Sequence, residues 1–219
     1  LQNHLDGRSP QLSVQYRIRA KSGESIWIET RGRVIERSAD GKPLRAIGVA
    51  IDVTERSRVE EADARKVHKE EFIGMLGRML LENRELDEIL DTAVHGLAGL
   101  LDVEFAKILK LLPTADALLL RAGHGWRAGL VGTATVSADR DSQAGYTLLS
   151  RQAVLVEDLR TEVRFRGSAL LIDHGVVSGM SVIIGDIERP YGVLSVHTSI
   201  RRRFEDSDVQ FLQNVANIV

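Results

Sequence analysis

A strand-like run leads directly into a helical segment near residue 54, and this junction most constrains how the chain can fold. Residues 46–53 alternate as a strand does, whereas residues 54–61 are charged and contain no Gly or Pro. Asp52 and Thr54 stand where the helix must start, and their side-chain oxygens can accept hydrogen bonds from the free amides of its first turn. The sequence therefore predicts a helix that leaves the sheet at a fixed angle, so that a distortion of the sheet would rotate the helix.

Three strands are predicted before this junction. Residues 13–21 and 26–37 are β-rich, and an Asp-Gly pair at 40 and 41 is a strong hairpin signal before the third run, 44–53. Both faces of the third run are apolar, so we expect this strand to be covered on both sides. A meander this small cannot bury a full core, which implies a partner surface.

The segment 55–82 has helical composition but an imperfect heptad pattern. A coiled-coil seam is fitted by Val59, Ala62, Ile73, Leu76 and Leu80, whereas Lys66 and Lys69 fall on seam positions between them. One interpretation is a paired helix whose seam is weak in the middle and admits two registers. The alternative is a solvated helix that lies against its own domain.

The remainder of the chain predicts a mixed layer of helices and strands. Helical spacing is clear from Leu86 to Leu101 and again after Asp206, and a short helix is expected at 142–150. Strands are expected at 103–112, 117–122, 153–156, 179–184 and 191–198. The fold class is therefore α+β, with an antiparallel sheet packed by an N-terminal and a C-terminal helix.

Composition excludes several functions. A net charge of -2 disfavours nucleic acid as a partner, because phosphate binding depends on clustered Lys and Arg. The absence of Cys removes disulfides, thiolate catalysis and thioether-linked chromophores, and it is compatible with a cytoplasmic location. No apolar run is long enough to span a membrane. Histidines without carboxylates or Cys at ligand spacing predict no metal site, with haem ligation by one imidazole as the alternative.

Two families are recognisable from longer stretches of residues. The run YRIRAKSGESIWIETRGRVIERSADGKPLRAIGVAIDVTER resembles the C-terminal half of a PAS domain, including its terminal Asp-Val-Thr-Glu-Arg motif. The stretches GWRAGLVGTATV, SQAGYTLLSRQAVLVEDLRTEVRF, HGVVSGMSVII and RPYGVLSVHTSIRRRFEDSDVQFLQNVANIV resemble a GAF domain. These resemblances imply part of a PAS domain at 1–55, a signalling helix at 56–82 and a GAF domain at 83–219.

Such pairs occur in bacterial histidine kinases of two-component systems and in diguanylate cyclases. The resemblance implies a sensory, non-catalytic fragment that forms a homodimer through its helices and whose output domain lies beyond its last helix. The early PAS strands are missing, so we expect no PAS cofactor and an unpaired edge along residues 44–53 that pairs with another chain. The chain starts without Met and stops inside an apolar helical pattern, which also predicts a fragment.

The GAF resemblance implies a small-molecule pocket on one face of the sheet. It would bring together Trp126, Tyr146, Phe165 and His174, although these aromatic side chains could equally fill a collapsed core. The NKFDE-type motif of some nucleotide-binding members is absent. Two alternatives remain: a homodimeric scaffold that binds nothing, and an enzyme like the rare GAF relatives that act on methionine sulfoxide through cysteine. No catalytic residue is predicted.

Overall fold

The computed structural model describes residues 11–219. Two compact units divide the chain, one ending at Lys66 and the other spanning Val67–Val219. Each is described by itself. The first ten residues of the domain predicted at 1–55 lie outside the described residues, and the predicted domain limits stay a prediction.

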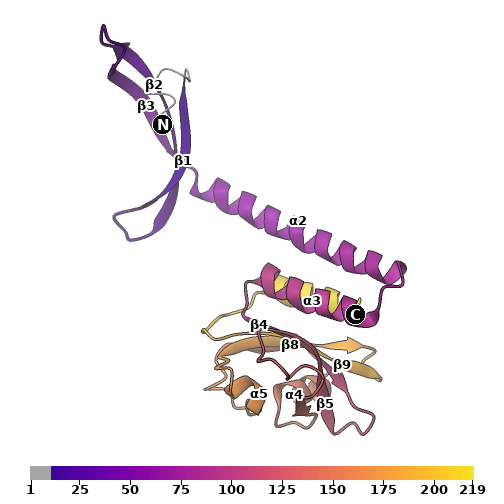
Figure 1. The fold of residues 1–219 in the computed structure, drawn as a ribbon. Coiled ribbons are helices and arrows are strands. Elements are labelled where there is room, and N and C mark those ends of the chain that lie inside the picture. Colours follow the sequence, from indigo (N-terminus) through magenta and orange to yellow (C-terminus); the bar gives the residue numbers. More distant parts are fainter. Residues whose placement is uncertain (1–10) are drawn as a thin grey trace. The chain divides into compact units, whose positions relative to one another are not determined.

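The first unit contains a three-stranded antiparallel sheet in the order β1-β2-β3 (Figure 1). Its strands are β1 (Leu12–Arg19), β2 (Ser25–Arg37) and β3 (Pro43–Asp52). The predicted hairpin at the Asp-Gly pair is confirmed, since Gly41 has a φ of 82° and donates its amide to the Ser38 carbonyl. A positive φ suits glycine because it has no side chain to clash.

The prediction that residues 44–53 are covered on both faces is wrong for this chain. All ten residues of β3 are exposed, among them Leu44 at 62% and Val49 at 59%. Apolar residues on both faces of a strand indicate two-sided burial, but burial needs a further layer, and residues 11–219 supply none here. Among the described strands β3 pairs with β2 alone, so its outer edge is unpaired as expected. Pairing of that edge with another chain stays a prediction.

Side-chain hydrogen bonds fix the start of α2 (Thr54–Leu81) to the sheet of the first unit. The Thr54 amide donates to Asp52 Oδ1 at 2.9 Å, as a helix start predicts. The Thr54 hydroxyl, however, accepts from the Trp27 amide of β2 at 2.9 Å, and not from the helix itself. Gln15 Nε2 of β1 donates to Ser57 Oγ at 2.7 Å. The first turn of the helix is therefore tied to two strands.

The second unit is a six-stranded antiparallel sheet in the order β6-β5-β4-β9-β8-β7, covered by helices on both faces (Figure 1). Helices α3 and α6 contact one face and α4 the other. Its elements are α3 (Leu86–Leu101), β4 (Phe105–Leu111), β5 (Ala117–His124), β6 (Thr135–Ser137), α4 (Gln143–Ser150), β7 (Val154–Val156), α5 (Ala169–Ile172), β8 (Ser178–Gly185), β9 (Pro190–Thr198) and α6 (Asp206–Ala216). The predicted α+β class is confirmed, whereas β6 and α5 were not predicted.

The main core lies between this sheet and helices α3 and α6. Helix α3 buries the face that its spacing predicts, apart from Leu86, which is 46% exposed in the first turn. Its buried residues are Ile89, Leu90, Ala93, Val94, Leu97, Ala98 and Leu101.

The C-terminal half of α2 belongs to the second unit and packs within it. Leu76 is fully buried in the main core, and the Phe72 ring lies against Gly96 of α3, where even a Cβ would clash with it. Lys69 forms an ion pair with Asp208 of α6 at 3.0 Å, and its ammonium lies 5.2 Å from the centre of the Phe211 ring. The predicted seam is therefore wrong at Leu76 and Lys69, because both face the helix's own domain.

Asp208 joins three parts of the second unit. Besides the Lys69 ammonium, its carboxylate accepts a hydrogen bond from the Glu205 amide at the start of α6. The Arg202 guanidinium lies 3.8 Å away. One carboxylate thus completes the capping box of α6 and holds α2 in place.

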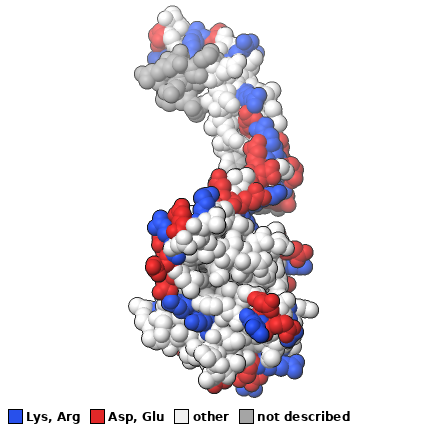
Figure 2. Space-filling model, turned by 90° about the vertical axis from the view of Figure 1, so that its right-hand side faces the viewer, with Lys and Arg blue, Asp and Glu red and all other residues white. Residues whose placement is uncertain are grey.

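On the face drawn in Figure 2, acidic and basic side chains are interspersed rather than separated by sign. None of the helices described in residues 11–219 combines the length and apolar character needed to cross a membrane. Within the same residues, no three His, Cys, Asp or Glu side chains gather in a way that could hold a metal ion.

Candidate functional site

The four residues predicted to line a pocket lie in the second unit as two pairs. The Trp126 and His174 rings have centroids 5.0 Å apart, and the Tyr146 and Phe165 rings have centroids 5.3 Å apart. Trp126 packs on a cluster with Leu109, whereas Tyr146 packs on the separate cluster that contains Phe165. Ligand binding by these four residues stays a prediction.

The first pair uses its polar atoms to hold the protein's own backbone. His174 Nε2 accepts from the Arg127 amide at 3.1 Å, and its Nδ1 lies 2.8 Å from the Leu170 carbonyl. A carbonyl can only accept, so Nδ1 carries the proton and the ring is neutral. Trp126 Nε1 donates to the Ala106 carbonyl at 2.8 Å. The nitrogens of both rings are therefore already hydrogen-bonded, and only the carbon atoms of the rings are left to contact a ligand.

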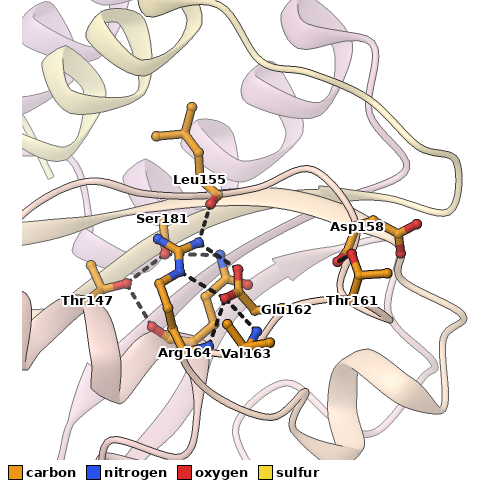
Figure 3. Close-up of polar contacts among 9 residues, drawn as sticks. Thr147, Leu155, Asp158, Thr161, Glu162, Val163, Arg164 and Ser181 are labelled. Atoms are coloured by element: carbon orange, nitrogen blue, oxygen red, sulfur yellow. Dashed lines mark hydrogen bonds and ion pairs between the residues drawn. The ribbon is translucent and has the colours of Figure 1, made fainter.

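The second pair, Tyr146 and Phe165, lies beside an arginine whose orientation is fixed by hydrogen bonds. The Arg164 guanidinium lies 5.7 Å from the Tyr146 ring centre and 5.5 Å from that of Phe165. It donates two hydrogen bonds to Glu162, at 2.9 and 2.6 Å, and one to the Leu155 carbonyl at 2.6 Å (Figure 3). Charge-assisted, two-pronged pairing of this kind fixes orientation. The Arg164 charge is therefore already compensated.

Two buried basic residues that sequence reasoning missed lie next to Trp126. Lys107 of β4 is 2% exposed and His197 of β9 is 1% exposed. The Lys107 ammonium lies 5.1 Å from the Trp126 ring centre, and the His197 and Trp126 centroids are 6.0 Å apart. Lys107 pairs across the sheet with Ser195, which precedes His197 by two residues on the same strand. Both side chains therefore point to the same face of the sheet, the one that α4 covers.

Neighbouring polar groups on this face satisfy one another. Gln143 Nε2 of α4 donates to Ser181 Oγ at 3.1 Å, and Ser181 lies 2.7 Å from Thr147 Oγ1. The Thr147 hydroxyl donates to the Gln143 carbonyl at 2.8 Å, so Ser181 must be the donor to Thr147. Figure 3 shows the Thr147 and Ser181 contact. Gln143, Ser181 and Thr147 are thus each hydrogen-bonded to another member of this set.

Lys107 and His197 differ: among the described residues Lys107 has no carboxylate partner, and His197 has no hydrogen-bond partner. Both ring nitrogens of His197 are buried without a hydrogen-bond partner in the described part of the chain. Burial lowers the pKa of Lys107 to about 7. Burial also lowers the pKa of His197 well below its usual value, and the Lys107 charge lowers it further. A buried polar group left unpaired costs about 1–3 kcal/mol, so this pair is a candidate contact for a ligand.

Glycine on the next strand makes room for His197. A Cβ on Gly179 of β8 would lie 2.2 Å from His197 Nδ1 and 2.8 Å from the Val196 carbonyl oxygen. We expect Gly179→Ala to lower the free energy of unfolding by about 1–3 kcal/mol through overpacking. Urea unfolding followed by Trp126 fluorescence in a Trp27→Phe background measures this.

A matched control is Gly99→Ala on α3, where a Cβ would meet nothing within 4 Å. Alanine favours a helix over glycine, so this variant should be unchanged or slightly more stable. Adding His197→Ala to Gly179→Ala removes the ring from the clash and should cost less than the sum of the two single changes. Strict additivity would contradict the inferred contact.

A sequence signal for these two residues exists but is faint. In Phe105–Leu111, Lys107 is a charged residue at a buried position, whereas the other charged residue of this strand, Lys110, is exposed. His197 lies near the end of β9, among mainly apolar residues. Only the cross-strand register brings them together.

The first unit and much of the chain resemble known proteins. A family model described as a PAS fold matches residues 1–50. The biofilm dispersion protein BdlA of Pseudomonas aeruginosa is 26% identical over 167 residues, which cover 76% of this chain. The chain spans only 36% of that protein's length.

Solved structures share the fold of the second unit. The GAF domain of a phosphoenolpyruvate-protein phosphotransferase from Coxiella burnetii superposes with a TM-score of 0.62 at 12% identity, covering 69% of this chain and 89% of that one. Free methionine-R-sulfoxide reductase from Neisseria meningitidis gives 0.58 at 16% identity, with 68% and 84% covered. The family model described as a GAF domain matches residues 85–219, more than half of the chain, and the chain therefore belongs to the GAF domain family.

Proposed function

We propose that this chain is a regulatory segment of a bacterial signalling protein, in which the GAF domain binds a small molecule. One observation carries the proposal: beside an aromatic cluster, both ring nitrogens of buried His197 have no hydrogen-bond partner among the described residues, and buried Lys107 contacts the Trp126 ring rather than a carboxylate. Apolar surroundings with a few polar groups are typical of small-ligand sites. A sensory rather than catalytic role in the cytoplasm accords with the absence of cysteine.

The proposal includes a relay through α2. This helix is unbroken from Thr54 to Leu81. Its first turn is tied to β2 through the Trp27 amide, and its C-terminal half is held to α6 by Lys69 and Asp208. A ligand can shift such a helix only if it binds one arrangement more tightly than another. The relay would feed an output domain such as a histidine kinase or a diguanylate cyclase.

A thermal-shift screen of small metabolites on the purified chain tests ligand binding. We expect at least one compound to raise the melting temperature, with the increase growing with ligand concentration. Amide hydrogen exchange with and without that compound then tests the relay, which requires slower or faster exchange within residues 54–70. A compound that binds without any change there would remove the relay, and a screen with no stabilising compound would remove the sensing role.

A scaffold that only associates is the second candidate. The three-stranded sheet favours it, because large apolar side chains on it are exposed: Val14, Tyr16, Ile18, Ile35, Leu44, Ile47, Val49 and Ile51. Exposed apolar surface of this kind marks interaction sites. Light scattering distinguishes the two candidates, since a scaffold would form a homodimer without any ligand.

A further inference from the structure

Lys107 is a buried amine that lacks a counter-charge. Burial is the one cause that lowers the pKa of Lys107, and no carboxylate of residues 11–219 forms an ion pair with it. Its contact with the Trp126 ring face is favourable but neutral in formal charge. An isolated charge in an apolar interior is costly unless it is paired or loses its proton. The site therefore favours a negatively charged occupant.

His197 supplies the second contact. In the neutral ring one nitrogen donates a hydrogen bond and the other accepts one, and both are unused among the described residues. Its strand neighbour Ser195 pairs with Lys107, so the two basic side chains start about 7 Å apart on one sheet face. One compact oxyanion group between them could accept a hydrogen bond from each.

The side chains around Lys107 and His197 indicate which kind of anion would fit between them. Trp126 packs against Phe105 and His174, with ring centroids 4.9 and 5.0 Å away. The satisfied Gln143, Ser181 and Thr147 chain offers no further charge. Phosphate sites typically combine several donors, such as arginines or a helix N-terminus. A single Lys and a His next to aromatic rings suit a singly charged group on an apolar body.

We propose that the ligand of this site is a small apolar monocarboxylate whose carboxylate contacts Lys107 and His197. The proposal rests on the ligand-binding role proposed above and names its chemical class. The titratable groups that the described structure places around Lys107 are His197 on β9 and, across the Trp126 ring, His174; the α4 side chains Gln143 and Thr147 are neutral.

Benzoate and its neutral analogue benzamide test the class directly. We expect calorimetry at about pH 8 to show benzoate binding about tenfold or more tightly than benzamide, because a charged hydrogen bond is lost in the amide. Binding should take up about one proton, since the carboxylate favours the charged lysine. Repeating the titration in buffers of different ionisation enthalpy measures that proton.

Two variants distinguish carboxylate binding at Lys107 from the broader proposal that the GAF domain binds a small molecule. Lys107→Met should abolish both the preference for benzoate and the proton uptake, whereas Lys110→Met, on the same strand but exposed, should change neither. Equal binding of the two compounds, benzoate binding unchanged in Lys107→Met, tighter binding of inorganic phosphate, or no binding of benzoate at millimolar concentration would each overturn the proposal. A neutral metabolite that binds independently of Lys107 would overturn it while leaving the sensing role intact.

Discussion

Replacing Lys107 by methionine is expected to stabilise the ligand-free protein at pH 7. The pKa of this lysine is lowered to about 7 by burial, whereas in the unfolded chain it is about 10.4. Between these values the unfolded state binds more protons, so the wild-type free energy of unfolding rises with pH. Methionine removes the buried amine, and the gain at pH 7 should be on the order of 4 kcal/mol.

The pH dependence distinguishes this cause from better packing. The difference between variant and wild type should shrink as pH rises from about 7 through the unfolded-state pKa of about 10.4, and vanish about one pH unit above it, where the lysine is neutral in both states. Urea unfolding at a series of pH values measures it. Lys110→Met should stay within about 0.5 kcal/mol of wild type, since this side chain is exposed. A Lys107→Met variant less stable than wild type at pH 7 would show that the lysine is stabilising.

Leu76→Ala is expected to lower the free energy of unfolding by about 2–5 kcal/mol. Leu76 is fully buried among side chains of α3 and α6, so its truncation leaves a cavity in the main core. Denaturation of the second unit, followed by Trp126 fluorescence in the Trp27→Phe background, measures the loss.

Leu81→Ala is the matched control, because Leu81 ends the same helix at 84% exposure and should cost little. The pair also separates the two interpretations of α2. If Leu76 belonged to an intermolecular seam, its replacement would weaken association and make stability depend on protein concentration. Loss of stability at every concentration is the result that core packing requires.

Most of the fold could be predicted because its signals are local. The Asp-Gly hairpin, the spacing of α3 and the short helix expected at 142–150 each depend on a few consecutive residues. Elements with too few residues for a periodic signal were missed, namely β6 and α5. The prediction that β3 is covered on both faces was wrong for a different reason. An apolar composition shows that a strand could be buried, but whether it is buried depends on which elements pack against it.

The candidate site was predicted only in part. Aromatic residues drew attention to Trp126 and His174, which do lie together, but their nitrogens turned out to bind the backbone. Lys107 and His197 are 90 positions apart, and only the pairing of β4 with β9 makes them neighbours. Whether a buried polar atom has a partner is a property of the packed structure, so sequence alone could not single out these two.

The shared role of Asp208 limits how this domain can diverge. Its carboxylate serves the first turn of α6 and the Lys69 ammonium of α2 at once. A substitution there would loosen the attachment of one helix and fray the beginning of another in a single step. A change that alters the attachment of α2 without disturbing the start of α6 would therefore have to fall at another position, such as Phe72.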